Sequence, residues 1–122
     1  MPKKNLVKFK VYDKDMPAPT EEGGNLMLRP RVDGVIFPGQ LVFVPMNCIL
    51  SDATQLFLAI LDVETLKKGG VLASPLFTKN TDEELGVIIR ATDPLWTLEL
   101  NKITVAAVPL SRVAMEFKKE DA

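Results

Sequence analysis

The sequence predicts an all-β protein, a single-domain β-sandwich or barrel of about eight to ten short strands. Three observations support this fold class. Short apolar segments alternate with polar residues at a period of two, which is typical of half-buried strands. Proline and glycine residues separate these segments at regular spacing. The length of 122 residues suits one domain, assigned here to residues 1–122.

The first part of the chain is predicted to contain one strand followed by a loop. In residues 6–12, Val7 and Phe9 point to one side of the strand, and lysines occupy the other side. These lysines are interpreted as a solvated strand edge, because lysine discourages edge-to-edge pairing of sheets. Residues 13–24 are rich in acids, prolines and glycines, and this composition is typical of a loop.

The main sheet is predicted to span residues 26–117, and a charged tail follows at residues 118–122. The clearest turn in this sheet is at Pro38 and Gly39. Proline presets the first central position of a turn, and glycine permits a positive φ at the second.

Three later segments complete the predicted sheet. Residues 55–61 (QLFLAIL) form a strand that is apolar on both faces. Residues 64–68 are expected to form one helical turn, which the following glycine pair ends. Residues 84–110 have the pattern of a strand, a turn, a short strand, a turn and a strand. The last strand is expected at residues 112–117.

The composition excludes several kinds of chemistry. Histidine is absent, which removes the commonest general base, the commonest metal ligand and every Ser-His or Cys-His nucleophile. Cys48 is the only cysteine, so an intramolecular disulfide and a cysteine zinc cluster are impossible. We predict that Cys48 is a small buried hydrophobe. The formal net charge of −1 gives no overall field that attracts nucleic acid or an anionic membrane.

The acidic run at residues 82–84 is the one candidate for a metal site, since hard cations take oxygen ligands. Neighbouring residues on a strand point to opposite faces, however, and no second acidic cluster lies at a defined spacing. We therefore interpret the run as a solvated turn. No metal ligand, no cofactor and no catalytic residue is predicted in the chain.

Two apolar surfaces exceed what one core needs. They are the two-faced strand at residues 55–61 and the pair of terminal strands. A strand that is apolar on both faces requires a second cover, and self-association supplies one. Trp96 is interpreted either as a core residue or as an interface anchor. The predicted self-association or partner interface consists of Val7, Phe9, Leu56, Leu58, Trp96, Val113, Met115 and Phe117.

The chain resembles the dUTPase fold over roughly residues 17–110. The family's hairpin, with its PPG and VPTG motifs, is similar to residues 37–45 (FPGQLVFVP). The family's GDRIAQ strand resembles residues 100–105 (LNKITV), and residues 23–26 (GGNL) lie where the family has AGYDL. The resemblance implies the dUTPase-like fold and a trimer with exchanged end strands.

The residues that carry the chemistry of this family are not matched. Residues 62–65 (DVET) lie where the family has its Arg-Ser phosphate segment, PRSG, and two carboxylates repel a phosphate. Ala73 stands where the family has the aspartate that orients the attacking water. Val105 replaces the glutamine of GDRIAQ, and residues 111–122 lack the glycines of the arm that closes over the nucleotide.

We therefore expect a non-catalytic structural or assembly protein, a trimeric decoration or cement component of a phage particle. This expectation rests on analogy of fold. The alternatives are a nucleotide hydrolase of the dUTPase or dCTP deaminase type, and a dead relative that binds a nucleotide or host protein as a regulator. The expected partners are other copies of the chain and a larger assembly such as a capsid. Nucleic acid, a membrane and a disulfide-linked partner are not expected. We place the protein in a cytoplasmic pool that supplies a virion.

Overall fold

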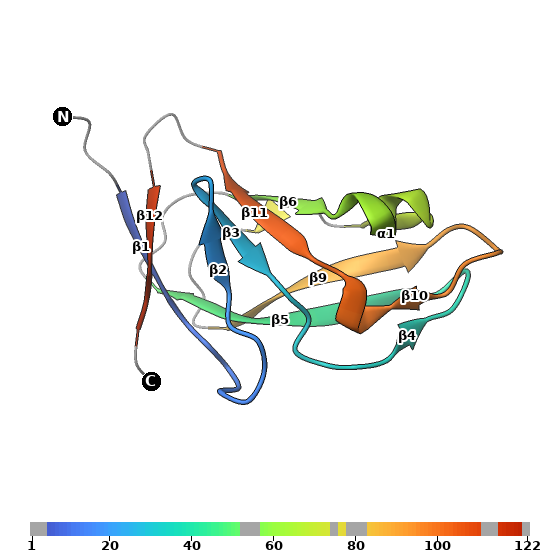
Figure 1. Cartoon of the computed structure of the whole chain (residues 1–122), viewed down its shortest axis with the longest axis horizontal. Helices are drawn as coiled ribbons and strands as arrows, with labels where there is room; N and C mark the ends of the chain where they lie inside the picture. Colours follow the sequence, from blue (N-terminus) through green and yellow to red (C-terminus); the bar gives the residue numbers. More distant parts are fainter. Residues whose placement is uncertain (1–4, 52–56, 74–75, 78–82, 111–114, 121–122) are drawn as a thin grey trace.

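The computed structural model describes residues 5–51, 57–73, 76–77, 83–110 and 115–120. These residues form two five-stranded sheets and a two-stranded ribbon, with one short α-helix and one short 3-10 turn (Figure 1). This arrangement confirms the predicted all-β fold class.

The first sheet, called the β5 sheet after its central strand, has the strand order β12-β1-β5-β9-β7. Neighbouring strands are antiparallel, except for β1 and β12, which run parallel. Its strands are β12 (Met115–Lys119), β1 (Asn5–Lys10), β5 (Leu41–Ser51), β9 (Glu84–Ala91) and β7 (Gly70–Leu72).

The second sheet, called the β11 sheet, has the order β2-β3-β11-β6-β8 and is antiparallel throughout. Its strands are β2 (Thr20–Glu22), β3 (Asn25–Leu28), β11 (Val105–Pro109), β6 (Phe57–Leu61) and β8 (Leu76–Phe77). The remaining elements are the ribbon strands β4 (Val35–Ile36) and β10 (Leu98–Glu99), the helix α1 (Val63–Lys67) and the 3-10 turn η1 (Leu100–Lys102).

One hydrophobic core joins the two sheets, and alternate residues of their strands fill it. Val44 and Val87 contribute from the β5 sheet, and Val105 contributes from the β11 sheet. The rings of Phe57 and Phe117 lie 6.1 Å apart between centroids and connect β6 to β12. The period of two in the sequence therefore identifies the buried side of these strands correctly.

Three residues of the predicted interface lie in the core of the chain itself. Val7, Phe9 and Phe117 are 2%, 5% and 9% exposed, so the chain already covers the side chains expected to meet a partner. The physical reason is that β1 and β12 pair with each other and turn their apolar sides inward. A partner surface on these strands must use their outward residues, which include lysines.

The other predicted interface residues have different positions. Trp96 is 46% exposed in the loop before β10, so the interpretation as a core residue of a strand is wrong. Leu58 is half-buried on β6, and Met115 lies on β12. Leu56 and Val113 lie outside the described residues.

Turn chemistry is predicted more accurately than strand length. Gly39 has a φ of +86°, and the main-chain N–H of Gln40 donates to the carbonyl of Phe37 at 3.0 Å, as expected for a turn at this position. By contrast, the segment 13–24 is not only a loop, because it contains β2. The sequence pattern predicts a strand at residues 40–45, and β5 continues beyond it to Ser51.

Cys48 is fully buried on β5, as predicted for a small hydrophobe. Burial raises the pKa of its thiol from 9.0 to about 12, with a smaller contribution from the carboxylate of Glu84. The reactive thiolate is therefore absent near neutral pH. We expect native Cys48 to remain unlabelled by a thiol reagent at pH 8 and to react readily in denaturant. Labelling of the native protein at the rate of the unfolded chain would contradict this assignment.

The same shift predicts a loss of stability in alkali. The unfolded thiol releases its proton near pH 9, whereas the folded thiol keeps it up to about pH 12. Because the unfolded state then binds fewer protons, the free energy of unfolding should fall as the pH rises through this window. Urea denaturation of the wild type and of Cys48→Ala at several pH values measures this contribution, which the variant should lack.

Candidate functional site

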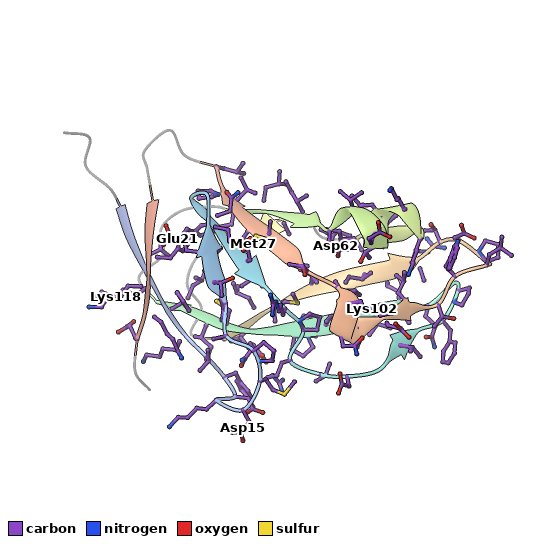
Figure 2. All side chains as sticks on the ribbon, viewed as in Figure 1. Asp15, Glu21, Met27, Asp62, Lys102 and Lys118 are labelled. Atoms are coloured by element: carbon purple, nitrogen blue, oxygen red, sulfur yellow. The ribbon has the colours of Figure 1, made fainter. Side chains whose placement is uncertain are left out.

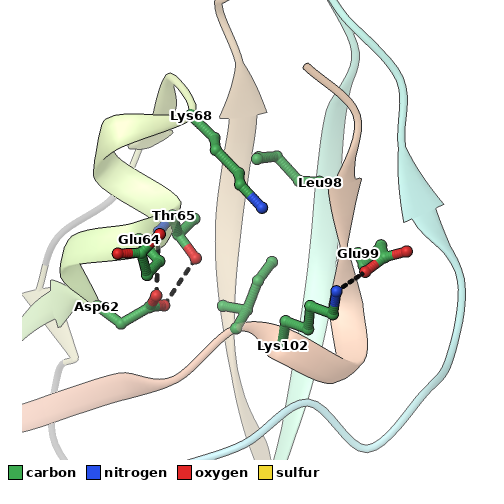
Figure 3. A pocket seen from close by; sticks show the side chains of 8 residues that line it. Asp62, Glu64, Thr65, Lys68, Leu98, Glu99 and Lys102 are labelled. Carbon is green, nitrogen blue, oxygen red and sulfur yellow. Dashed lines mark hydrogen bonds and ion pairs between the residues drawn. The ribbon is translucent and has the colours of Figure 1, made fainter.

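A cleft of about 330 Å³ lies between α1 and the turn η1 (Figure 3). Two segments that are far apart in the sequence form its walls. One segment is the helix α1 with its N-cap and C-cap residues, Asp62 and Lys68, and the other comprises β10, η1 and the residue that follows them. The charged side chains that line the cleft are Asp62, Glu64, Lys68, Glu99 and Lys102.

The carboxylate of Asp62 accepts three hydrogen bonds from the chain around it. As the N-cap of α1, it accepts from the main-chain N–H of Thr65 at 3.0 Å and from the Thr65 hydroxyl at 2.7 Å. It also accepts from the main-chain N–H of Thr104 at 3.0 Å. These donors at the cleft are therefore satisfied by a carboxylate of the chain itself.

These contacts join the two segments that resemble the phosphate motifs of dUTPases. Residues 62–65 match PRSG, and residues 100–105 match GDRIAQ. The main-chain N–H of Asp62 donates to the carbonyl of Thr104 at 3.0 Å, so the link runs in both directions. The structure thus brings the two matched segments together at one cleft, although their side chains differ from the motifs.

The electrostatics of the cleft do not favour a polyanion. Three carboxylates and two ammonium groups give it a formal net charge of −1. Lys102 and Glu99 form an ion pair at 2.7 Å. The hydrogen bond in this pair lowers the pKa of Glu99 and raises the pKa of Lys102, and the attraction of opposite charges adds to both shifts.

Lys68 is the remaining cation of the cleft. Figure 3 shows its side chain pointing into the space between α1 and β10. Its Nζ lies 5.4 Å from the centroid of the Trp96 ring, within the range of a cation–π contact. Among the described residues, no carboxylate forms an ion pair with Lys68. A single unpaired lysine beside three carboxylates is a weak site for a triphosphate.

Residues 70–73, where Ala73 replaces the family's water-orienting aspartate, offer no side chain that could orient water. Residues 70–73 contain β7. Ala73 follows this strand, and its main-chain N–H donates a hydrogen bond to the carbonyl of Ile88 at 2.8 Å. In the described ranges, no group of three or more acidic, cysteine or histidine side chains is placed to hold a metal ion. No helix in those ranges is long and apolar enough to cross a membrane.

Glu84 has a structural role that the sequence pattern does not indicate, so its interpretation as part of a solvated turn is wrong. Its carboxylate accepts hydrogen bonds from Nε and Nη2 of Arg31 at 2.6 and 2.9 Å. It also accepts from the main-chain N–H of Asn47 at 2.9 Å. The hydrogen bonds and the negative charge of Glu84 raise the pKa of Arg31. Asp82 lies outside the described residues, and Glu83 is exposed.

Asn47 forms the second part of this polar cluster. It is fully buried on β5 with a φ of +56°, at a shift in the β5–β9 register. Its Oδ1 accepts from the main-chain N–H groups of Tyr12 and Asp13 at 2.9 and 2.7 Å. Its Nδ2 donates to the carbonyls of Asp13 and Pro17 at 3.0 and 3.1 Å. Asn47 therefore fixes the segment that connects β1 to β2.

Comparison with known proteins gives a fold and no sequence match. No family model matches the chain, and no curated protein matches its sequence. A variant of the dUTPase of Staphylococcus bacteriophage 80alpha, bound to dUpNHpp, has a TM-score of 0.71 and 12% sequence identity, with 95% of this chain and 97% of that chain covered. A variant of the dUTPase from phage phi11 of S. aureus has a TM-score of 0.69 and 11% identity, with 97% and 98% covered.

The similarity extends across both sheets and beyond the segment 17–110 that the motifs suggest. At this level of identity it concerns the fold alone, so the activity of the phage enzymes does not follow from it. The chain has the dUTPase-like fold.

Proposed function

We propose that this chain is a non-catalytic assembly protein, a self-associating decoration component of a phage particle. The fold is one that phage dUTPases share, which supports a phage origin. Residues 62–65 at the cleft lack the arginine and serine of the matched PRSG motif, and Lys102, at the arginine position of GDRIAQ, is paired with Glu99. A protein that has this fold without the catalytic residues can still assemble with other proteins through its surfaces.

The observation that carries this proposal is the position of Asp62. Its carboxylate takes the main-chain donors of Thr65 and Thr104 at the cleft, where the matched motif would offer an arginine and a serine to phosphate. An incoming phosphate would have to displace a carboxylate that accepts three hydrogen bonds, and it would meet the repulsion of Glu64 and Glu99 as well.

Nucleotide turnover tests the absence of catalysis. We expect no magnesium-dependent release of pyrophosphate from dUTP and no deamination of dCTP, because Ala73 stands where the resemblance places the aspartate that orients water. Turnover that disappears in Asp62→Asn or Glu64→Gln would refute the proposal. Glu21→Gln, which removes an exposed carboxylate on β2 outside the cleft lining, is a matched control.

The native mass tests the assembly role. The purified chain should be oligomeric by light scattering, or it should bind to a preformed phage shell, and a trimer is the expected state. A strictly monomeric mass at all concentrations, together with no binding to any shell, would contradict the proposal.

A regulatory binder is the second candidate function. The 80alpha dUTPase is described as controlling the transfer of virulence genes by a G protein-like mechanism, so proteins of this fold can regulate. Lys68, which has no carboxylate partner among the described residues, is the group that could still contact a nucleotide. Calorimetry with a panel of deoxynucleotides distinguishes the two functions, since an assembly protein should give no heat of binding.

A further inference from the structure

The outer face of the β5 sheet is basic, although the whole chain has a formal net charge of −1. The inward residues of β1 fill the core, so Lys8 and Lys10 occupy the outward positions of this strand. Lys118 lies beside Lys8 in the register of β1 and β12. Arg90 alternates with the buried residues of β9 and is exposed on the same face. The fold thus gathers four cationic side chains on one face of the sheet.

These four cations have no acidic partner. Among the described residues, no carboxylate forms an ion pair with any of them. The described carboxylates on this face are Glu84 on β9, which binds Arg31, and Glu120, which directly follows β12. With Arg31 counted, five cationic and two acidic groups give the face a formal net charge of +3. Figure 2 shows Lys118 and Asp62 in separate parts of the molecule, so this basic face and the cleft are distinct.

Phe43 lies in the middle of this face, and its ring leans across the neighbouring strand. Phe43 pairs with Ile88 on β9, and Gly86 is the next outward position of that strand. A Cβ at Gly86 would collide with the far end of the Phe43 ring, so glycine leaves room for the ring there. The side chain of Phe43 is nevertheless 60% exposed. One side of the ring therefore rests on the sheet, and the other side is open to solvent.

A second exposed aromatic ring lies beside the same face. Glu84 occupies an outward position of β9 and binds the guanidinium of Arg31, whose central carbon lies 4.4 Å from the centroid of the Tyr12 ring. Tyr12 is 61% exposed. Along the strands, the rows from Arg90 to Lys8 span roughly 25 Å, since each strand residue advances about 3.3 Å. The face therefore combines cations and exposed aromatic rings along one extended surface.

We infer that the outer face of the β5 sheet binds single-stranded nucleic acid. Cations without partners attract the phosphates, and exposed aromatic rings offer a surface on which unpaired bases stack. A duplex or an anionic membrane supplies negative charge but no free base for the ring of Phe43. The expectation that nucleic acid is not a partner rests on the net charge of the whole chain, whereas the fold separates the charges between its surfaces.

The two kinds of residue have different tasks. Contact of phosphates with Lys8, Lys10, Lys118 and Arg90 releases counterions, so it supplies affinity that does not depend on base sequence. Stacking on Phe43 requires an unpaired base, and it therefore selects single strands over duplexes. This inference goes beyond the proposed assembly role and does not depend on it.

The salt dependence of binding tests the role of the cations. Fluorescence anisotropy should show that the wild type binds a labelled oligo(dT), and the logarithm of the binding constant should fall linearly with the logarithm of the salt concentration. Lys8→Gln with Lys118→Gln should make this slope shallower by about 1.4, because each phosphate contact on a single strand contributes about 0.7. An unchanged slope in the folded double variant would overturn the inference.

Substitutions of Phe43 test stacking. Phe43→Leu keeps an apolar side chain and should weaken binding of oligo(dT) roughly 5- to 100-fold, whereas Phe43→Tyr keeps the ring and should bind as the wild type does. Gly86→Ala leaves Phe43 in place but displaces its ring from the sheet, so it should also weaken binding. Circular dichroism confirms that each variant is folded. Equal binding by folded Phe43→Leu and Phe43→Tyr would contradict the stacking role.

A control at the cleft separates the two surfaces. Lys68→Gln removes one positive charge from the cleft and none from the basic face, so it should leave binding of oligo(dT) unchanged. If Lys68→Gln abolishes binding and the variants of the basic face do not, the oligonucleotide occupies the cleft, and the inference is overturned.

Two other polyanions serve as competing partners. A duplex of the same length should bind roughly 10-fold more weakly than oligo(dT), because its bases are not free to stack. Equal binding of the duplex, or binding of vesicles that contain phosphatidylserine without binding of oligo(dT), would overturn the inference. The native mass of the chain decides the assembly role separately in each of these cases.

Discussion

Replacing Asn47 with alanine should lower the free energy of unfolding by about 4 kcal/mol. The side chain is fully buried and forms four hydrogen bonds of 3.1 Å or less with the main chain of residues 12, 13 and 17. Alanine removes all of these bonds and leaves main-chain groups without partners beside β5. Each such group costs about 1–3 kcal/mol when water cannot replace the lost bond. Urea denaturation followed by tryptophan fluorescence measures the change.

Asn47→Gly separates the loss of the hydrogen bonds from the strain that alanine has at a positive φ. Asn47 has a φ of +56°, a conformation that glycine adopts without strain and alanine does not. Glycine should therefore destabilise less than alanine by about 1 kcal/mol, although it lacks the same hydrogen bonds. Asn25→Ala is the matched control, because Asn25 is half-buried on β3, and this change should cost less than about 0.5 kcal/mol.

Hydrogen exchange locates the effect of Asn47. The amide of Asn47 forms the hydrogen bonds between the segment 12–17 and β5, so the main-chain amides of this segment should lose protection in Asn47→Ala under conditions where the two sheets remain folded. An unchanged exchange pattern at Tyr12 and Asp13 in a folded variant would show that other contacts hold the segment.

Local pattern predicts the strands and turns of this fold because they depend on neighbouring residues. The alternation in Glu84–Ala91 correctly places Val87 and Ile89 inside, and the Pro38-Gly39 pair marks its turn. The two segments matched to PRSG and GDRIAQ also lie together at the cleft. Each of these signals comes from residues a few positions apart, where period and turn chemistry act directly.

Contacts between distant residues leave no such signal. Glu84 and Arg31 are 53 positions apart, and nothing in the acidic run at residues 82–84 points to an arginine on the other side of β5. Asn47 lies in the apolar run of residues 46–50, which gives no sign of a polar cluster. The inward direction of Val7 and Phe9 likewise depends on how β1 pairs with β12, which the alternation alone leaves undecided.

Glu84→Gln should lower the free energy of unfolding by roughly 2 kcal/mol, between the values typical of exposed and of fully buried ion pairs. The side chains of Arg31 and Glu84 are only 24% and 12% exposed, so the solvent screens this pair weakly. Glutamine keeps the shape of glutamate but can offer only one acceptor oxygen. Its NH₂ group must then face either the guanidinium of Arg31 or the main-chain N–H of Asn47, and both are donors.

Arg31→Lys should be nearly as costly, although it preserves the charge. Lysine cannot form the two parallel hydrogen bonds that Nε and Nη2 make to Glu84. The guanidinium carbon of Arg31 also lies 4.4 Å from the centroid of the Tyr12 ring, a stacking contact that an ammonium group does not reproduce.

A double-mutant cycle with Arg31→Met and Glu84→Gln isolates the energy of the pair, and the pair formed by Glu99 and Lys102 is its control. The shortest N–O distances are nearly equal, 2.6 Å and 2.7 Å, but the side chains of Glu99 and Lys102 are 50% and 69% exposed. If burial determines the strength of an ion pair, Arg31 and Glu84 should show a clear coupling energy, and the control pair should show almost none. Equal coupling in the two cycles would mean that distance, and not exclusion of water, determines the strength of these contacts.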